Sequence, residues 1–250
     1  MPEAVAQPEA STPGLSEVQR VVDTFVAPSK TFNDIQRSSS WWLPWLLGVL
    51  VTLAFGFAVQ QKIGWNQTYD NILRNTPSQQ QRMEQLTTAQ QARAKQIGVD
   101  FTKYAFWSAP LTGLLMALVA AAILLGTINF GFGGRAKFGQ MFAVWMYGSL
   151  PLSLKGILGI VTIYAGVDPH AFNLQNFVGS NFGYYLPQST AKWLMAAGTS
   201  LDIFIIWTLI LLTIGCAAVG KIKRGQAATA VWGWWVLIVL IRIVAASFGA

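Results

Sequence analysis

Residues 201–220 read LDIFIIWTLILLTIGCAAVG, and within this stretch only Asp202 carries a charge. A helix rises about 1.5 Å per residue, so a run of this length covers the roughly 30 Å hydrocarbon core of a bilayer. A segment inside lipid must also satisfy its own backbone hydrogen bonds, which a helix does without a partner strand. The stretch therefore predicts a membrane-spanning helix.

Four further apolar runs of similar length lie along the chain, at residues 41–61, 108–130, 141–165 and 230–249. Tryptophans gather within a few residues of the ends of these runs, as Trp41, Trp107 and Trp232 do. Such belts are typical of the membrane–water interface. The sequence thus predicts an all-α integral membrane protein built as a bundle of five transmembrane helices.

The composition supports a membrane protein and excludes several other classes. Of the 250 residues, 53% are hydrophobic and 11% charged, against about 25% charged in a soluble domain. One Cys and one His exclude a disulfide framework and the Cys/His zinc patterns. Because no long basic run accompanies the net charge of +7, we expect the lipid bilayer as partner and no nucleic acid. Other membrane proteins and self-association are left open as further partners.

The segment before the first run divides into a tail and two short helices. Residues 1–14 show no periodic apolar pattern, so we expect a disordered tail without a signal peptide. Residues 15–40 predict two amphipathic helices separated by Pro28, with Lys30 and Arg37 flanking the second. One helical face of the first carries Leu15, Val18, Val21, Val22 and Phe25. The two helices either pack on the protein or lie in the headgroup region on the cytoplasmic side, and the second alternative is preferred.

Residues 41–250 form the predicted five-span domain, and its connections carry the orientation signal. The Gln-rich residues 62–107 predict a helical insertion outside the membrane. The two short turns that contain Arg135 and Lys137, and Lys221, Lys223 and Arg224, are densely basic. Short basic loops stay in the cytoplasm. We therefore expect a bacterial cytoplasmic membrane protein with a cytoplasmic N-terminus, an extracytoplasmic insertion and an extracytoplasmic C-terminus.

Three ionisable residues fall inside or at the edge of the runs, namely Lys155, Asp202 and Arg242. Charges in lipid are costly and mark candidate sites. Counting residues along each run places all three in the outer half of the bilayer, so Asp202 can form an ion pair with Lys155 or with Arg242. Alternatively, both cations snorkel outward and Asp202 only begins a helix. Pro151 is expected to kink the third span, because it has no N–H for the carbonyl of Tyr147.

Signatures of enzymes and cofactor sites are missing from the sequence. His170 stands alone in a loop, and Cys216 lies within an apolar run. The Gly-rich residues 129–134 join two spans and lack the Lys-Ser/Thr ending of a phosphate-binding loop. We therefore predict no catalytic, cofactor-binding or metal-binding residues and no enzymatic activity.

Three short motifs resemble the Yip family, the Ypt/Rab-interacting membrane proteins with five spans and a cytosolic N-terminus. They are FVAPSKTFNDI at 25–35, YGSLP at 147–151 and LDIFIIW at 201–207. The resemblance covers roughly residues 20–249, and the insertion after the first span resembles bacterial members. Eukaryotic members carry Asp-Leu-x-Gly-Pro near their first spans. Here the nearest candidate, Ser108-Ala109-Pro110, has no Asp, so a link to Rab GTPases is not implied.

The resemblance implies a non-enzymatic membrane protein that organises partners or lipid. A transporter or channel subunit is the alternative, suggested by the kinked third span and the intramembrane charges. Five spans show no inverted repeat of the kind that builds many transporters. An intramembrane enzyme is a third hypothesis, but the chain lacks a paired nucleophile and base.

Overall fold

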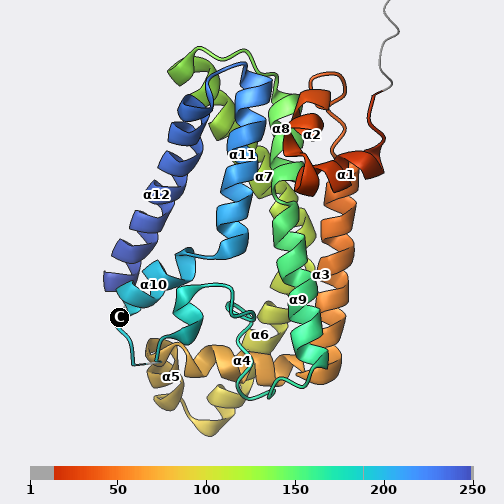
Figure 1. The fold of residues 1–250 in the computed structure, drawn as a ribbon. Coiled ribbons are helices and arrows are strands. Elements are labelled where there is room, and N and C mark those ends of the chain that lie inside the picture. Colours follow the sequence, from red (N-terminus) through yellow and green to blue (C-terminus); the bar gives the residue numbers. More distant parts are fainter. Residues whose placement is uncertain (1–13, 188, 249–250) are drawn as a thin grey trace, which may run out of the picture.

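A computed structural model describes residues 14–187 and 189–248 (Figure 1). Apart from Gly14, the tail predicted to be disordered lies outside the described residues. Within the described part of the chain the secondary structure is helical, and the only β-type pairing is an isolated bridge between Asn181 and Asp202. Five helical segments are long and apolar enough to cross a membrane. The predicted all-α, five-span fold class is therefore confirmed.

The five spanning segments start and end close to the predicted runs, with one exception. They are α3 (Trp42–Lys62), α7 (Ala109–Gly126) continued by the π-helix η1 (Thr127–Gly131), α8 (Phe138–Gly148) with α9 (Leu150–Tyr164), α11 (Ile203–Gly220) and α12 (Arg224–Phe248). The exception is α12, which begins at Arg224 instead of residue 230. Its first turn contains polar residues that hydropathy excludes but that a helix accepts readily.

The other helices cap the two ends of the bundle. At one end lie α1 (Glu17–Val26) and α2 (Pro28–Asp34). At the opposite end lie α4 (Trp65–Arg74), α5 (Pro77–Glu84), α6 (Thr88–Trp107), the short helix η2 (Phe182–Tyr185) and α10 (Lys192–Ser200) (Figure 1). We call these the N-terminal end and the insertion end. The C-terminal end of α12 also points toward the insertion end (Figure 1).

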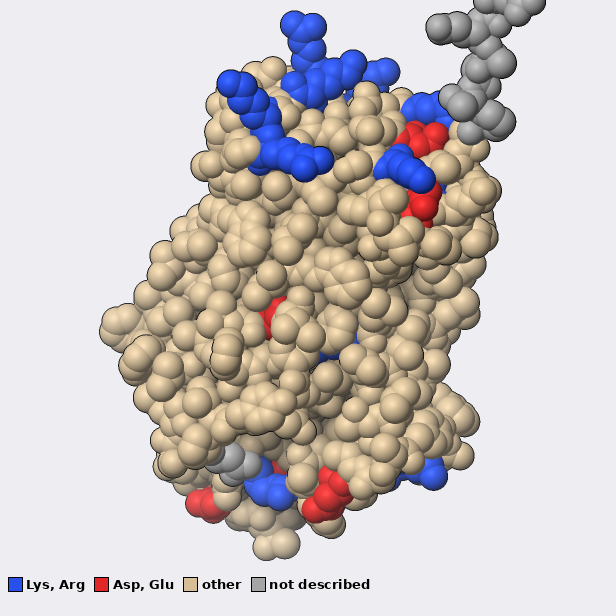
Figure 2. All heavy atoms as spheres, viewed as in Figure 1, with Lys and Arg blue, Asp and Glu red and all other residues tan. Residues whose placement is uncertain are grey.

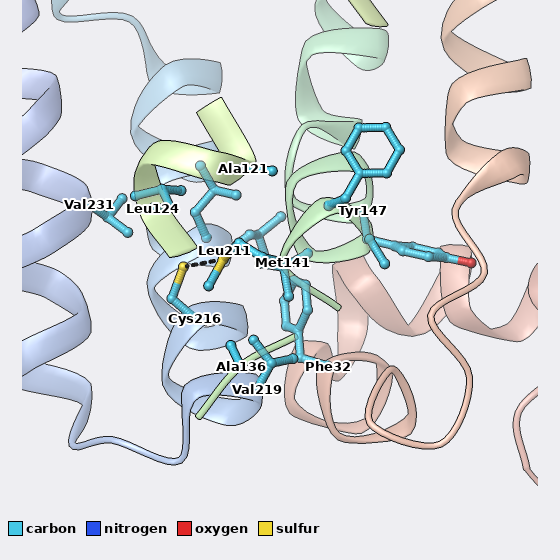
Figure 3. Close-up of a cluster of buried hydrophobic side chains, with 14 of the residues drawn as sticks. Phe32, Ala121, Leu124, Ala136, Met141, Tyr147, Leu211, Cys216, Val219 and Val231 are labelled. Atoms are coloured by element: carbon cyan, nitrogen blue, oxygen red, sulfur yellow. Dashed lines mark hydrogen bonds between the residues drawn. The ribbon is translucent and has the colours of Figure 1, made fainter. Parts of the chain in front are cut away.

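The core lies where α2, α7, α8 and α11 meet (Figure 3). Met141, Tyr147 and Cys216 are fully buried there, and the sulfur atoms of Met141 and Cys216 are 3.6 Å apart. A smaller cluster at the insertion end contains Phe55, Trp65 and Phe172. The last span takes little part in either cluster, since only 6% of the most apolar stretch of α12 is buried.

Charged side chains gather at the two ends of the molecule, and a wide band between them is nearly uncharged (Figure 2). The two basic turns that the sequence places on one side do lie together, because the Arg135 N–H donates to the Gly220 carbonyl at 3.2 Å. Gln36 of the α2 region joins them by donating to the Ala218 carbonyl at 3.2 Å. A surface band with few charges is expected of a protein that spans a bilayer, because charges in lipid are costly.

Candidate functional site around Asp202

Asp202 sits at the junction where the chain leaves α10 and begins α11. Its backbone is extended, and its Oδ1 accepts hydrogen bonds from the N–H groups of Phe204 at 2.8 Å and Ile205 at 3.4 Å. The first N–H groups of a helix have no partner within the helix, so this carboxylate oxygen satisfies two of them. Asp202 is therefore an N-cap of the fourth span.

The second carboxylate oxygen of Asp202 binds Lys155 from α9. Lys155 Nζ lies 2.8 Å from Asp202 Oδ2, with side chains that are 17% and 0% exposed. The ammonium also lies 5.6 Å from the centre of the Phe177 ring, within the range of a cation–π contact. The sequence left open whether Asp202 forms an ion pair or only begins a helix. In the structure Asp202 does both.

A loop segment completes the site. Ser180 Oγ lies 2.5 Å from Asp202 Oδ2, and Asn181 Nδ2 lies 3.5 Å from the same oxygen. The backbone adds a further bond, because the Ile203 N–H donates to the Ser180 carbonyl at 3.0 Å. These contacts fasten the loop between α9 and α10 to the start of α11. Sequence reasoning missed both residues, since a neutral Ser-Asn pair in a loop carries no distinguishing signal.

Arg242 bonds to a different residue near the start of α11. Its Nη1 donates to Ser200 Oγ at 3.3 Å, and Ser200 Oγ in turn donates to the Ala196 carbonyl at 2.7 Å. Arg242 is exposed at the protein surface, whereas Ser200 is buried. The structure therefore brings Lys155 and Asp202 together and ties Arg242 to α10 instead.

The third span is interrupted near its middle. One residue, Ser149, separates α8 from α9, and Pro151 occupies the first turn of α9. The Ser149 N–H still bonds to the Trp145 carbonyl at 3.0 Å. Pro151 has no N–H to offer the carbonyl of Tyr147, so the helical ladder cannot continue through it. Near Pro151, where the sequence predicts a kink, the structure has a junction between two helices.

A second ionic cluster, which sequence reasoning did not identify, joins the N-terminal helices to each other. Arg20 is 1% exposed, and its Nε and Nη2 atoms each lie 2.7 Å from Asp34 Oδ2. Glu17 of α1 accepts a 2.8 Å hydrogen bond from the hydroxyl group of Tyr147 in α8. This hydroxyl group points away from the core cluster (Figure 3). The sequence alone assigns no role to Arg20. The possible signal was the i,i+3 spacing of Arg20 from Glu17, which is common on solvated helices.

The surroundings of Asp34 change its acidity. Burial alone would raise the pKa of this carboxyl group. The hydrogen bonds and positive charges of Arg37 and Arg20 outweigh that effect, so the pKa lies below its usual value. Arg37 Nε contributes directly, at 2.9 Å from Asp34 Oδ1. Asp34 is therefore the ionised centre of a two-arginine clamp that holds α1 on α2.

The arrangement favours structural roles for these charges. No group of three His, Cys, Asp or Glu residues that could hold a metal ion occurs in residues 14–187 and 189–248. His170 is exposed in the loop after α9, where its backbone N–H donates to Asp168 Oδ1 at 2.9 Å. Cys216 is buried against Met141. Asp202 and Asp34 both bind groups within the chain, so each ties separate elements to one another.

Comparison with known proteins finds one family profile that matches most of the chain. The profile described as the Yip1 domain matches residues 22–246. A relative described as membrane protein YknW of Bacillus subtilis is 26% identical over 230 residues, which cover 91% of this chain and 87% of the relative. No solved structure matches the chain at a significant level.

Proposed function

This chain belongs to the Yip1 domain family, and from this premise we propose that it is a non-enzymatic membrane protein that binds and organises other components of the bacterial cytoplasmic membrane. The similar B. subtilis protein is itself described as a membrane protein. In this role the outer surface of the bundle makes the contacts, and the polar groups inside the bundle form its framework.

The observation that carries the proposal is the internal pairing of the intramembrane charges. Asp202 accepts hydrogen bonds from the α11 backbone, from the loop and from Lys155. Arg242 bonds to Ser200. A carrier site needs polar groups that exchange a substrate for another partner, whereas breaking a buried pair is strongly destabilising. These charges are better suited to fixing the fold than to binding cargo.

The surface offers α12 as the element for partner contact. It packs on α10, α11 and η1, and most of its outer face is apolar and exposed, as at Leu237, Leu240 and Ile241. Association of helices in lipid depends on van der Waals packing between them, because the hydrophobic effect does not drive association there. We propose that the outer face of α12 contacts another membrane protein.

The test places a photo-crosslinking amino acid at Ile241, which is 59% exposed, and at Val231, which is 3% exposed, in the full-length chain in its native membrane. A discrete protein adduct from position 241 and none from the buried control at 231 is the expected result. Mass spectrometry of the adduct identifies the partner. Labelling of lipid alone at position 241 and at its neighbours on the same face would contradict partner binding through α12.

A transporter or channel subunit is the alternative, favoured by the broken third span and the Lys155–Asp202 pair. Reconstituted vesicles distinguish the two functions. Solute flux that disappears in a folded Asp202→Asn variant would establish transport and replace the proposal above.

A further inference from the structure

A cavity of about 510 Å³ lies between α3, α7 and the α8–α9 segment. This volume falls in the range of about 300–1,000 Å³ that is typical of ligand sites. Its walls include Gly48, Phe55, Gly113, Ala117 and Gly156. None of the described residues that line it is charged. An occupant must therefore be largely apolar and without a strongly charged group inside the cavity.

Contacts between α3 and α9 show which residues of the two helices lie at the same level along the cavity. A Cβ atom placed on Gly48 would lie 3.8 Å from Ser153 Oγ, and one placed on Gly156 would lie 2.7 Å from Val51 Cγ1. Gly48 is therefore opposite Ser153, and Val51 is opposite Gly156. Because the residue numbers increase in the same direction on both helices, α3 and α9 run parallel. The same register puts Trp45 of α3 level with the junction at Ser149.

Two polar groups in the cavity wall have no partner at this height. Trp45 Nε1 and Ser149 Oγ are both buried atoms without a hydrogen bond, and both residues line the cavity. Leaving a buried donor unpaired costs about 1–3 kcal/mol. Both groups can donate, and the absence of a lining cation makes a neutral acceptor, such as an ester carbonyl, a better match than a phosphate.

The length of the cavity suits an acyl chain. Trp45 lies one turn beyond Trp42, the first residue of α3, so the polar end of the cavity begins about 5 Å along that helix. From Trp45 to Phe55, which stacks on Phe106 with ring centres 6.0 Å apart, the apolar cavity continues for about 15 Å. That length is about half of the 30 Å hydrocarbon core, the share of one leaflet.

We propose that this cavity binds one acyl chain of an ester-linked glycerolipid from the leaflet at the N-terminal end of the bundle. The ester carbonyl accepts hydrogen bonds from Trp45 Nε1 and Ser149 Oγ, and the chain extends toward Phe55 and Phe106. The inference deepens the proposed function, on which it rests, by naming a lipid as one of the components that the protein binds.

The first test uses the full-length chain in nanodiscs that contain phosphatidylcholine with a photoreactive acyl chain. We expect labelled peptides from α3, α7 and α9 around the cavity. Gly113 lines the cavity, and a Cβ atom there would meet nothing within 4 Å. Gly113→Phe should therefore place its ring in the cavity and abolish this labelling. Gly126→Phe is the matched control, since Gly126 lies on the same helix, has equal room for a Cβ atom and is outside the cavity. Equal labelling in the two variants would overturn the proposal.

The second test addresses the two donors. Wild-type protein should label more strongly with the ester-linked photolipid than with its ether-linked analogue, by roughly fivefold for one net hydrogen bond. The double variant Trp45→Phe/Ser149→Ala should lose this preference and keep its melting temperature. A wild-type chain without ester preference would overturn the proposed contact. The protein crosslinks expected from position 241 do not depend on either test, so failure of the lipid site and failure of partner binding are distinguishable.

Discussion

At Asp202 the two oxygens of one carboxylate perform separate tasks. Oδ1 caps α11, while Oδ2 holds Lys155 and Ser180. Losing the cap costs about 1 kcal/mol, whereas leaving a buried cation without its partner costs about 3–5 kcal/mol. The two contributions can therefore be separated by removing the acid first and the base afterwards.

Asp202→Ala should lower the melting temperature of the detergent-solubilised protein clearly, because Lys155 is left unpaired. Adding Lys155→Met should recover most of the loss and leave only the smaller cost of the missing cap. Adding Arg242→Met should recover nothing, since Arg242 bonds to Ser200. Lys192→Met, at an exposed position of α10, is the control. A neutral Asp202→Ala variant would show that water at the bundle edge makes the pair unimportant.

The lowered pKa of Asp34 makes the N-terminal clamp sensitive to acid. A carboxyl group whose pKa is lower in the folded protein stabilises it fully above the unfolded pKa, which is about 3.9. That stabilisation is lost as the pH falls through the lower, folded value. Melting curves should therefore show wild type above Asp34→Asn at pH 6, with the difference closing below pH about 4. A difference that stays constant from pH 6 to pH 3 would exclude the clamp.

Sequence reasoning identified Lys155 and Asp202 because ionisable residues stand out in apolar runs. It could not choose between Lys155 and Arg242, since a count of residues gives depth but not the rotation of one helix against another. Ser180 was out of reach for a different reason, because tertiary packing alone brings its loop to Asp202. The buried Arg20 was missed because a charge outside the spans looks like solvated surface.

At the scale of single elements, α1 divides its apolar face between two surroundings. Phe25 packs against Trp207 of α11, with ring centres 5.5 Å apart. Val18, Val22 and Val26 point outward and are 65%, 53% and 73% exposed. Helical periodicity predicted one stripe, but it could not show that only part of the stripe would find protein. The outward valines suit contact with lipid near the membrane surface.

A polarity-sensitive dye attached to Val22→Cys should therefore report an apolar environment in nanodiscs with anionic lipid. The same dye at Lys30→Cys, an exposed position of α2, should report water. Cys216 is buried and should not react. Identical spectra at the two positions in all lipid mixtures would mean that α1 does not lie against the membrane.

For the whole molecule, the five spans put α1 and the last residues of α12 at opposite ends of the bundle (Figure 1). The basic turns gather at the N-terminal end, where Arg135 and Gly220 meet. Local patterns were sufficient for this level of the fold, because each span is a long apolar run. Local patterns could not predict how the spans pack on one another, because the fit of side chains decides that packing. The α8–α9 junction shows a similar limit, because Pro151 indicates an interruption without defining its shape.

The positive-inside rule predicts that the N-terminal end faces the cytoplasm. A reporter fused after Ala250 should therefore behave as extracytoplasmic. The same reporter fused after Lys223, which lies before α12, should behave as cytoplasmic and serves as the matched control. Both fusions reporting the same side would mean that α12 does not cross the membrane.

The sparse packing of α12 has a consequence for how the protein is made. Ribosomes deliver the segments of a chain in order, so residues 224–248 emerge after the other four spanning segments. The other spanning segments can form the buried core, to which α12 adds Ala227, Ala230 and Val231 near its start. Newly synthesised chains should thus pass through a state in which the preceding helices are already assembled while the last one is still being inserted. Docking of α12 against α10 and α11 then completes biogenesis.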